Sequence, residues 1–130
     1  MYRWLEHTSE VELSIEAESA GAVFEEATRA FGELLAEAPP GESVERHVNA
    51  QASDLPALLV EWLSELAYLA ETDAFIPERA LRVDLADTSL EALVAGRRAE
   101  PQSLVKGVTY HRLEMKRADG SWRARVVLDV

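Results

Sequence analysis

The sequence predicts an α+β fold: a sandwich of mixed or antiparallel β-sheet with two main helices, in a single domain over residues 1–130. Three observations support this class. Strand-like alternation opens the chain, two segments with helical periodicity follow in the first half, and the second half is rich in strands again. A chain of 130 residues suits one domain around one hydrophobic core.

The first segment predicts two strands with a polar interruption between them. Residues 2–5 carry bulky alternate side chains, and the polar run 7–10 separates them from the next strand. In residues 11–17 every second side chain is apolar and those between are polar. This strand should therefore bury one face and leave the other in water.

Two helices are expected in the first half of the chain. Ser19 can cap the first, which should end at the Pro-Pro-Gly of residues 39–41. Residues 44–52 predict a strand between the helices. Ser53 is the expected N-cap of the second helix, which tolerates Pro56 in its first turn. This second helix has the most apolar sequence of the chain, so we expect it to be the central core element.

The second half begins with an expected loop over residues 72–77. Strands are then predicted around residues 81–85 and 90–94, and residues 96–103 form a polar connector. The segment 105–115 predicts a strand pair or a single bent strand.

Two glycines carry specific expectations in the last third of the chain. Gly107 should mark a bulge or a close approach of backbones. The Asp119-Gly120 pair is a strong hairpin signal, which should return the chain antiparallel into the closing strand.

The closing segment, residues 122–130, alternates apolar and mostly polar side chains up to its last residue. Asp129 therefore stands beside the terminal carboxylate of Val130 at a strand end, and two fixed negative charges repel unless a cation or a donor lies between them. This end is either a core strand with a solvated acidic tip or half of a site for a hard cation. The second interpretation needs a further ligand from elsewhere in the chain.

Composition excludes several classes of function. With 24 acidic and 13 basic residues the net charge is −11, which argues against strong direct binding to nucleic acid. The absence of cysteine excludes disulfides, thiol catalysis and Cys-ligated metals. Since the sequence has neither a run of about eighteen apolar residues nor a signal-peptide pattern, we expect a cytoplasmic protein without a membrane partner.

Three segments together resemble the archease family. They are His-Thr-Ser-Glu at residues 7–10, Lys-Gly-Val-Thr-Tyr-His at residues 106–111, and Val-Leu-Asp-Val at residues 127–130. The helix segment 58–66 also looks like the family's second helix. The resemblance spans nearly the whole chain, so residues 1–130 read as one archease-like domain.

The resemblance implies an accessory protein rather than an enzyme. Its partner would be the GTP-dependent tRNA-splicing RNA ligase, which joins a 3′-phosphate or cyclic phosphate end to a 5′-hydroxyl. The accessory protein would promote guanylylation of the ligase histidine and so allow multiple turnovers. The family's earlier description, a chaperone-like modulator of a tRNA methyltransferase, is the alternative.

The resemblance also implies a divalent cation, Ca²⁺, Mg²⁺ or Mn²⁺, bound through Glu10 and Asp129, and the terminal carboxylate of Val130 is a further candidate ligand. Two positions depart from the family pattern. Ser9 stands where the family usually has alanine, and Glu10 stands where it usually has aspartate. The longer glutamate alters the geometry available to the cation.

Three further residues are candidate contacts with the partner or its nucleotide site. His7 either donates hydrogen bonds behind the metal ligands or caps the turn between two strands. Lys106 either contacts a phosphate or a ligase carboxylate or is a solvated strand lysine. His111 is expected to be an exposed or half-buried strand residue.

No nucleophile with an adjacent base stands out, so no catalytic residue is assigned. A metal-dependent hydrolase built on Glu10, Asp129 and His7 remains the enzyme alternative.

Overall fold

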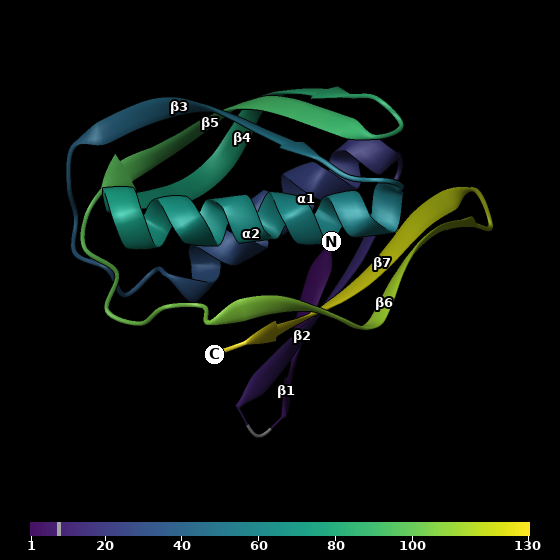
Figure 1. Cartoon of the computed structure of the whole chain (residues 1–130), viewed down its shortest axis with the longest axis horizontal. Coiled ribbons are helices and arrows are strands. Elements are labelled where there is room, and N and C mark those ends of the chain that lie inside the picture. Colours follow the sequence, from purple (N-terminus) through teal and green to yellow (C-terminus); the bar gives the residue numbers. More distant parts are fainter. Residues whose placement is uncertain (8) are drawn as a thin grey trace.

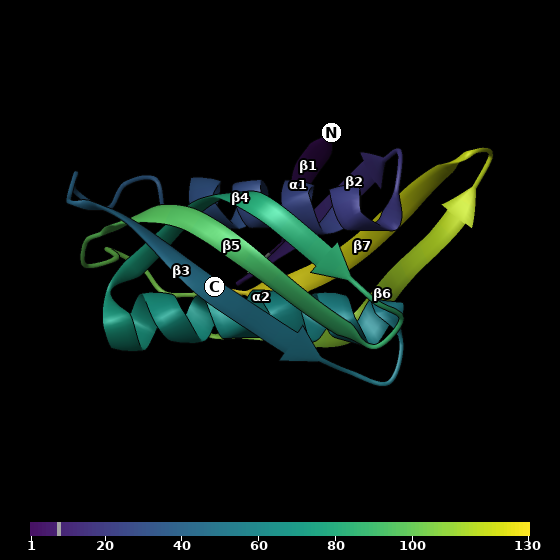
Figure 2. The ribbon, with the colours of Figure 1, turned by 90° about the horizontal axis from the view of Figure 1, so that it is seen from above.

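The computed structural model describes residues 1–7 and 9–130, with His7 described by its backbone alone. Two helices lie between two antiparallel sheets, which gives three layers (Figures 1 and 2). The helices are α1 (Ala20–Leu34) and α2 (Leu55–Asp73). This architecture confirms the predicted α+β class with two main helices, and all its described strand pairs are antiparallel.

The four-stranded sheet has the strand order β1-β2-β7-β6 and therefore joins both ends of the chain. Its strands are β1 (Tyr2–His7), β2 (Glu10–Ala17), β6 (Gly107–Ala118) and β7 (Ser121–Asp129). The three-stranded sheet has the order β3-β5-β4. Its strands are β3 (Ser43–Gln51), β4 (Phe75–Leu85) and β5 (Ser89–Arg98).

The core lies where α2 crosses between the sheets, as its apolar sequence predicts. Trp62 of α2 is fully buried, and its indole Nε1 donates a hydrogen bond of 2.9 Å to Thr28 Oγ1 of α1. Thr28 in turn donates to the backbone carbonyl of Phe24, at 2.8 Å. The buried polar atoms between the helices are thus satisfied, which avoids the cost of an unpaired donor. No helix in the described chain is long and apolar enough to cross a membrane.

The N-cap of α1 agrees with the prediction, and the N-cap of α2 differs from it. Ser19 caps α1 as predicted, since its hydroxyl accepts from the Ala22 amide at 3.1 Å. The cap of α2 is Asp54, and the prediction of Ser53 was wrong by one residue. The Asp54 carboxylate accepts from the Ala57 amide at 2.9 Å, and its negative charge suits the helix N-terminus. Pro56 lies in the first turn, as predicted.

The predicted loop at residues 72–77 is wrong because α2 and β4 are almost continuous. Ala74 alone connects them, in a left-handed conformation with φ 51°. The predicted connector over 96–103 also starts too early, because β5 continues to Arg98. Gly96 lies inside that strand. A Cβ at this position would lie only 2.2 Å from the Ile76 carbonyl oxygen, so the close approach requires glycine.

The last third of the chain forms a long hairpin. β6 is one bent strand whose register shifts between Thr109 and Glu114, where Arg112 has a positive φ of 58°. The bulge is therefore not at Gly107, where a Cβ would meet nothing within 4 Å. Asp119 and Gly120 both have positive φ and form the predicted tight turn into β7.

Candidate functional site

Glu10 and Asp129 are direct partners across neighbouring strands. Glu10 begins β2 and Asp129 ends β7, and the antiparallel register pairs the two positions. The same row continues to His7 on β1 and to Gly107 on β6. One row across the four-stranded sheet therefore passes through all three segments that carry the family resemblance.

The backbone fixes how close the two acidic residues stand. The Val130 amide donates to the Ser9 carbonyl at 3.1 Å, so Ser9 and Val130 are bonded to each other and Glu10 and Asp129 form the next, non-bonded pair. In such a pair the Cα atoms are only about 4.5 Å apart and the side chains leave the same face of the sheet. Leu13 on the opposite face of β2 is fully buried, so Glu10 and Asp129 leave the face that points away from the helices, here called the outer face.

No described lysine or arginine side chain offsets the charge of this carboxylate pair. Neither Glu10 nor Asp129 forms an ion pair with a lysine or arginine within the described residues, and both are half-buried. Two carboxylates so placed repel each other and attract a cation. Their oxygens are the donors that Ca²⁺, Mg²⁺ and Mn²⁺ prefer.

The side chains supply only part of a coordination shell. Across residues 1–7 and 9–130, leaving out the His7 side chain, no three His, Asp or Glu side chains gather as a group that could hold a metal ion. Glu10 and Asp129 fit a cation only if backbone oxygens, water or the carboxylate of Val130 complete the shell. Such a mixed oxygen shell suits Ca²⁺, which accepts irregular geometry, better than Mg²⁺.

Lys106 joins the site and His111 does not. The Lys106 amide donates to the Asp129 carbonyl at 2.8 Å, and its side chain is exposed. His111 lies four residues beyond Gly107 along β6, about 13 Å from the row, and is exposed. The His7 side chain and all of Thr8 lie outside the described residues, so the expected role of His7 stays a prediction.

Sequence reasoning missed a charged pair beside the site, Glu12 and Arg112. Glu12 follows Glu10 on the outer face of β2, yet it is only 4% exposed. Arg112 Nη1 lies 3.2 Å from Glu12 Oε1, close enough for an ion pair, although that oxygen has no hydrogen bond of good geometry. The two groups attract each other at this distance, because charge attraction depends less on angle than a hydrogen bond does. Nothing in the alternation of β2 distinguishes Glu12 from Glu10 or Glu16 on the same face.

Known proteins resemble this chain over nearly its whole length. The Archease protein family (MTH1598/TM1083) matches residues 2–130. Protein archease of Methanosarcina mazei is 36% identical over 140 residues, which cover 99% of this chain and 95% of that protein. Protein archease of Methanosarcina acetivorans is 32% identical, with the same coverage of 99% and 95%.

Solved structures share the fold. An archease from Thermotoga maritima, described as a possible chaperone, superposes with a TM-score of 0.69 at 19% identity, over 100% of this chain and 98% of that one. Protein 1598 of Methanobacterium thermoautotrophicum gives a TM-score of 0.66 at 23% identity, over 99% of this chain and 98% of that one. From the sequence match over nearly its whole length, this chain belongs to the archease family.

Proposed function

We propose that this chain is an accessory protein that activates a GTP-dependent tRNA-splicing RNA ligase. It would promote guanylylation of the ligase histidine, so that the ligase joins RNA ends through many turnovers. Family membership supports this assignment, and the observation that carries it is the cross-strand pairing of Glu10 with Asp129. That pairing gives the chain a built acidic site at one end of its sheet.

The acidic pair is proposed to hold a divalent cation, with Val130 contributing its carboxylate. Once bound, the cation would supply positive charge that can draw phosphate oxygens to this edge. The role of Glu10 and Asp129 is to fix that charge on two rigid strands, and the Val130–Ser9 hydrogen bond keeps the end of β7 in register. Ca²⁺ is the favoured ion because of the mixed shell described above.

Lys106 is the proposed contact with the ligase or its nucleotide. Its backbone is bonded to Asp129 while its ammonium is exposed, so it can offer a positive charge beside the acidic pair. His7 shares the row and remains a proposed hydrogen-bonding neighbour, whereas the position of His111 gives it no support as a contact at this site.

A chaperone-like role is the second candidate, and the description of the Thermotoga maritima archease as a possible chaperone favours it. In that case the chain would modulate a tRNA methyltransferase instead. Both candidates make the chain an accessory protein, so both differ from the metal-dependent hydrolase.

A turnover assay tests the proposed function. Purified ligase, GTP and Mn²⁺ are incubated with excess RNA ends, and guanylylation of the ligase is followed with and without this protein. We expect the wild type to extend the reaction to many turnovers and Asp129→Asn to lose most of that effect. Asp119→Asn is the matched control: it removes the same charge at a turn position that asparagine suits, so it should activate fully. Equal activation by both variants would remove the acidic pair from the mechanism.

A further inference from the structure

The outer face of the four-stranded sheet changes sign along its strands. Glu10 and Asp129 form an acidic end of this face, at the start of β2 and the end of β7. Toward the opposite end, the same face carries basic side chains from β1, β6 and β7: Arg3, Lys116, Arg123 and Arg125. In a chain of net charge −11, composition does not explain this local excess of basic residues.

The register brings these basic residues together. Ser14 of β2 is paired with Arg3 on one side and with Arg125 on the other. In the next row of the same face, Glu16 is paired with Arg123. Since directly paired residues leave the same face, Arg3 and Arg125 flank the short side chain of Ser14, and Arg123 lies in the next row.

A hollow lies at this place. Its volume is about 300 Å³, and its lining includes Arg3, Ser14, Glu16 and Arg123. Ser14 accounts for the space, because a small hydroxyl stands there between long side chains on both neighbouring strands.

Two of the four basic groups are already committed. Arg125 donates to the Arg112 carbonyl at 2.9 Å and to Glu114 at 3.0 Å, and Lys116 pairs with the same Glu114 at 3.0 Å. Arg3 and Arg123 have no ion pair or side-chain hydrogen bond among the described residues, and both are exposed. Glu16 is the one acidic residue in the lining of the hollow that the structure describes.

We propose that this hollow binds the phosphate group of a small phosphate-bearing molecule through the guanidinium groups of Arg3 and Arg123. A guanidinium offers paired N–H donors that match phosphate oxygens, and charge-assisted bonds of this kind are the strong ones. The volume suits a small ligand. An extended polyanion is disfavoured because the net charge of −11 repels it beyond the hollow.

The site is separate from the acidic pair. Ser14 and Glu16 lie about 14–20 Å along β2 from Glu10. Asp129→Asn, which should abolish cation binding, is therefore expected to leave phosphate binding unchanged.

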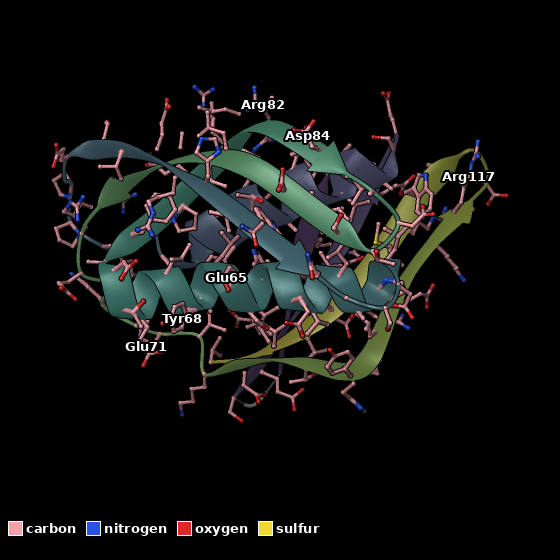
Figure 3. The ribbon with its side chains drawn as sticks, turned by 45° about the horizontal axis from the view of Figure 1, so that its top comes forward. Glu65, Tyr68, Glu71, Arg82, Asp84 and Arg117 are labelled. Carbon is pink, nitrogen blue, oxygen red and sulfur yellow. The ribbon has the colours of Figure 1, made fainter. Side chains whose placement is uncertain are left out.

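Pyrophosphate is the probe, titrated by NMR and calorimetry at low salt against folded wild type and variants. Arg3→Gln and Arg123→Gln should each weaken binding roughly tenfold, since each removes a charged donor. Glu16→Gln should tighten binding because it removes the opposing charge. Arg82→Gln is the charge-matched control on β4 of the opposite sheet (Figure 3) and should bind as the wild type does.

A second arm identifies the source of the phosphate. An oligoribonucleotide of twelve residues without terminal phosphates is titrated in the same way and should bind more weakly than pyrophosphate. Tighter binding of the oligonucleotide, lost in Arg3→Gln, would overturn the small-molecule assignment in favour of RNA. Equal affinity of wild type, Arg3→Gln and Arg123→Gln for pyrophosphate, or an equal loss in Arg82→Gln, would overturn the site itself. Amide shifts that remain dispersed in each variant show that the fold is intact.

Discussion

At the scale of single residues, the charge of Asp129 is expected to cost stability, and Asp129 is also a proposed cation ligand. It lies directly opposite Glu10, so without a cation the two carboxylates repel each other. Asp129→Asn removes that repulsion at nearly constant shape. The cation-free protein should keep its thermal midpoint or gain slightly, while the rise in midpoint on adding Ca²⁺ should disappear. Thermal unfolding with and without Ca²⁺ measures both effects; an undiminished Ca²⁺ response would exclude Asp129 as a ligand.

The Glu10 side chain is one methylene longer than that of an aspartate, and that length should control ion preference. Glu10→Asp draws the carboxylate closer to the strand. A closer, stiffer ligand set favours Mg²⁺, which requires near-octahedral geometry at about 2.1 Å. We expect the variant to retain cation binding and to bind Mg²⁺ more tightly relative to Ca²⁺. Calorimetric titration of both ions measures the ratio, and an unchanged ratio would contradict the assignment.

Tyr2 gives the fold a pH-dependence at high pH. Burial first, and then its hydrogen bond to the Glu33 carboxylate, raise the pKa of Tyr2 to about 12. The unfolded chain ionises near pH 10, so the stabilisation is complete below about 10 and is lost as pH rises toward 12. Tyr2→Phe should remove that loss from urea unfolding curves, while Tyr68→Phe, at a 58% exposed tyrosine of α2 (Figure 3), should retain it. Parallel pH profiles for Tyr2→Phe and wild type would contradict this assignment.

At the scale of elements, the bulge of β6 coincides with the Arg112–Glu12 ion pair. The register shift and the positive φ of Arg112 turn its side chain across β7 toward Glu12 of β2. The two partners are not equivalent, since Glu12 is 4% exposed and the Arg112 side chain is 49% exposed.

Removing either partner of this pair should therefore have unequal effects. Arg112→Ala leaves a buried carboxylate without a counter-ion and should lower the unfolding free energy by about 1–3 kcal/mol. Glu12→Gln leaves a half-exposed guanidinium that water can solvate, so its cost should stay below about 1 kcal/mol. The double variant should be more stable than Arg112→Ala alone. Urea unfolding of the three proteins measures the difference; equal losses for the two single variants would show that burial of Glu12 is not what matters.

Elements defined by local patterns were predictable, and those defined by tertiary contacts were not. The alternation of β2, the Ser19 cap and the Asp119-Gly120 turn depend on neighbouring residues alone, and all three were predicted. The prediction ended the strand at Gly96, because the Ile76 carbonyl that requires a glycine there is far away in sequence. The bulge near Arg112 likewise involves a tertiary contact, the ion pair with Glu12 on another strand.

At the scale of the whole molecule, net charge sets the response to nucleic acid. A surface of net charge −11 repels tRNA at long range, even with basic groups gathered at one end of the outer face. We expect the isolated protein to bind tRNA weakly, if at all, at physiological salt. A gel-shift titration measures this; micromolar or tighter binding that weakens steeply with salt would contradict it and give the basic side chains a direct role in handling RNA.

The placement of Glu10 opposite Asp129 was predicted as a requirement of the site, and the strand register meets it. The basic end of the face could not be predicted in the same way, because its residues are scattered over β1, β6 and β7.

The strand order β1-β2-β7-β6 has a consequence for how the protein folds. Because β7 is inserted between β2 and β6, the acidic pair joins two strands that lie far apart in the sequence, at residues 10 and 129. Such a pairing closes a long loop, so it belongs among the late and slow steps of folding. A chain that lacks β7 holds only Glu10 and has no acidic pair. Cation binding would then report that β2 and β7 have paired, and chains in which these strands have not met would lack the site.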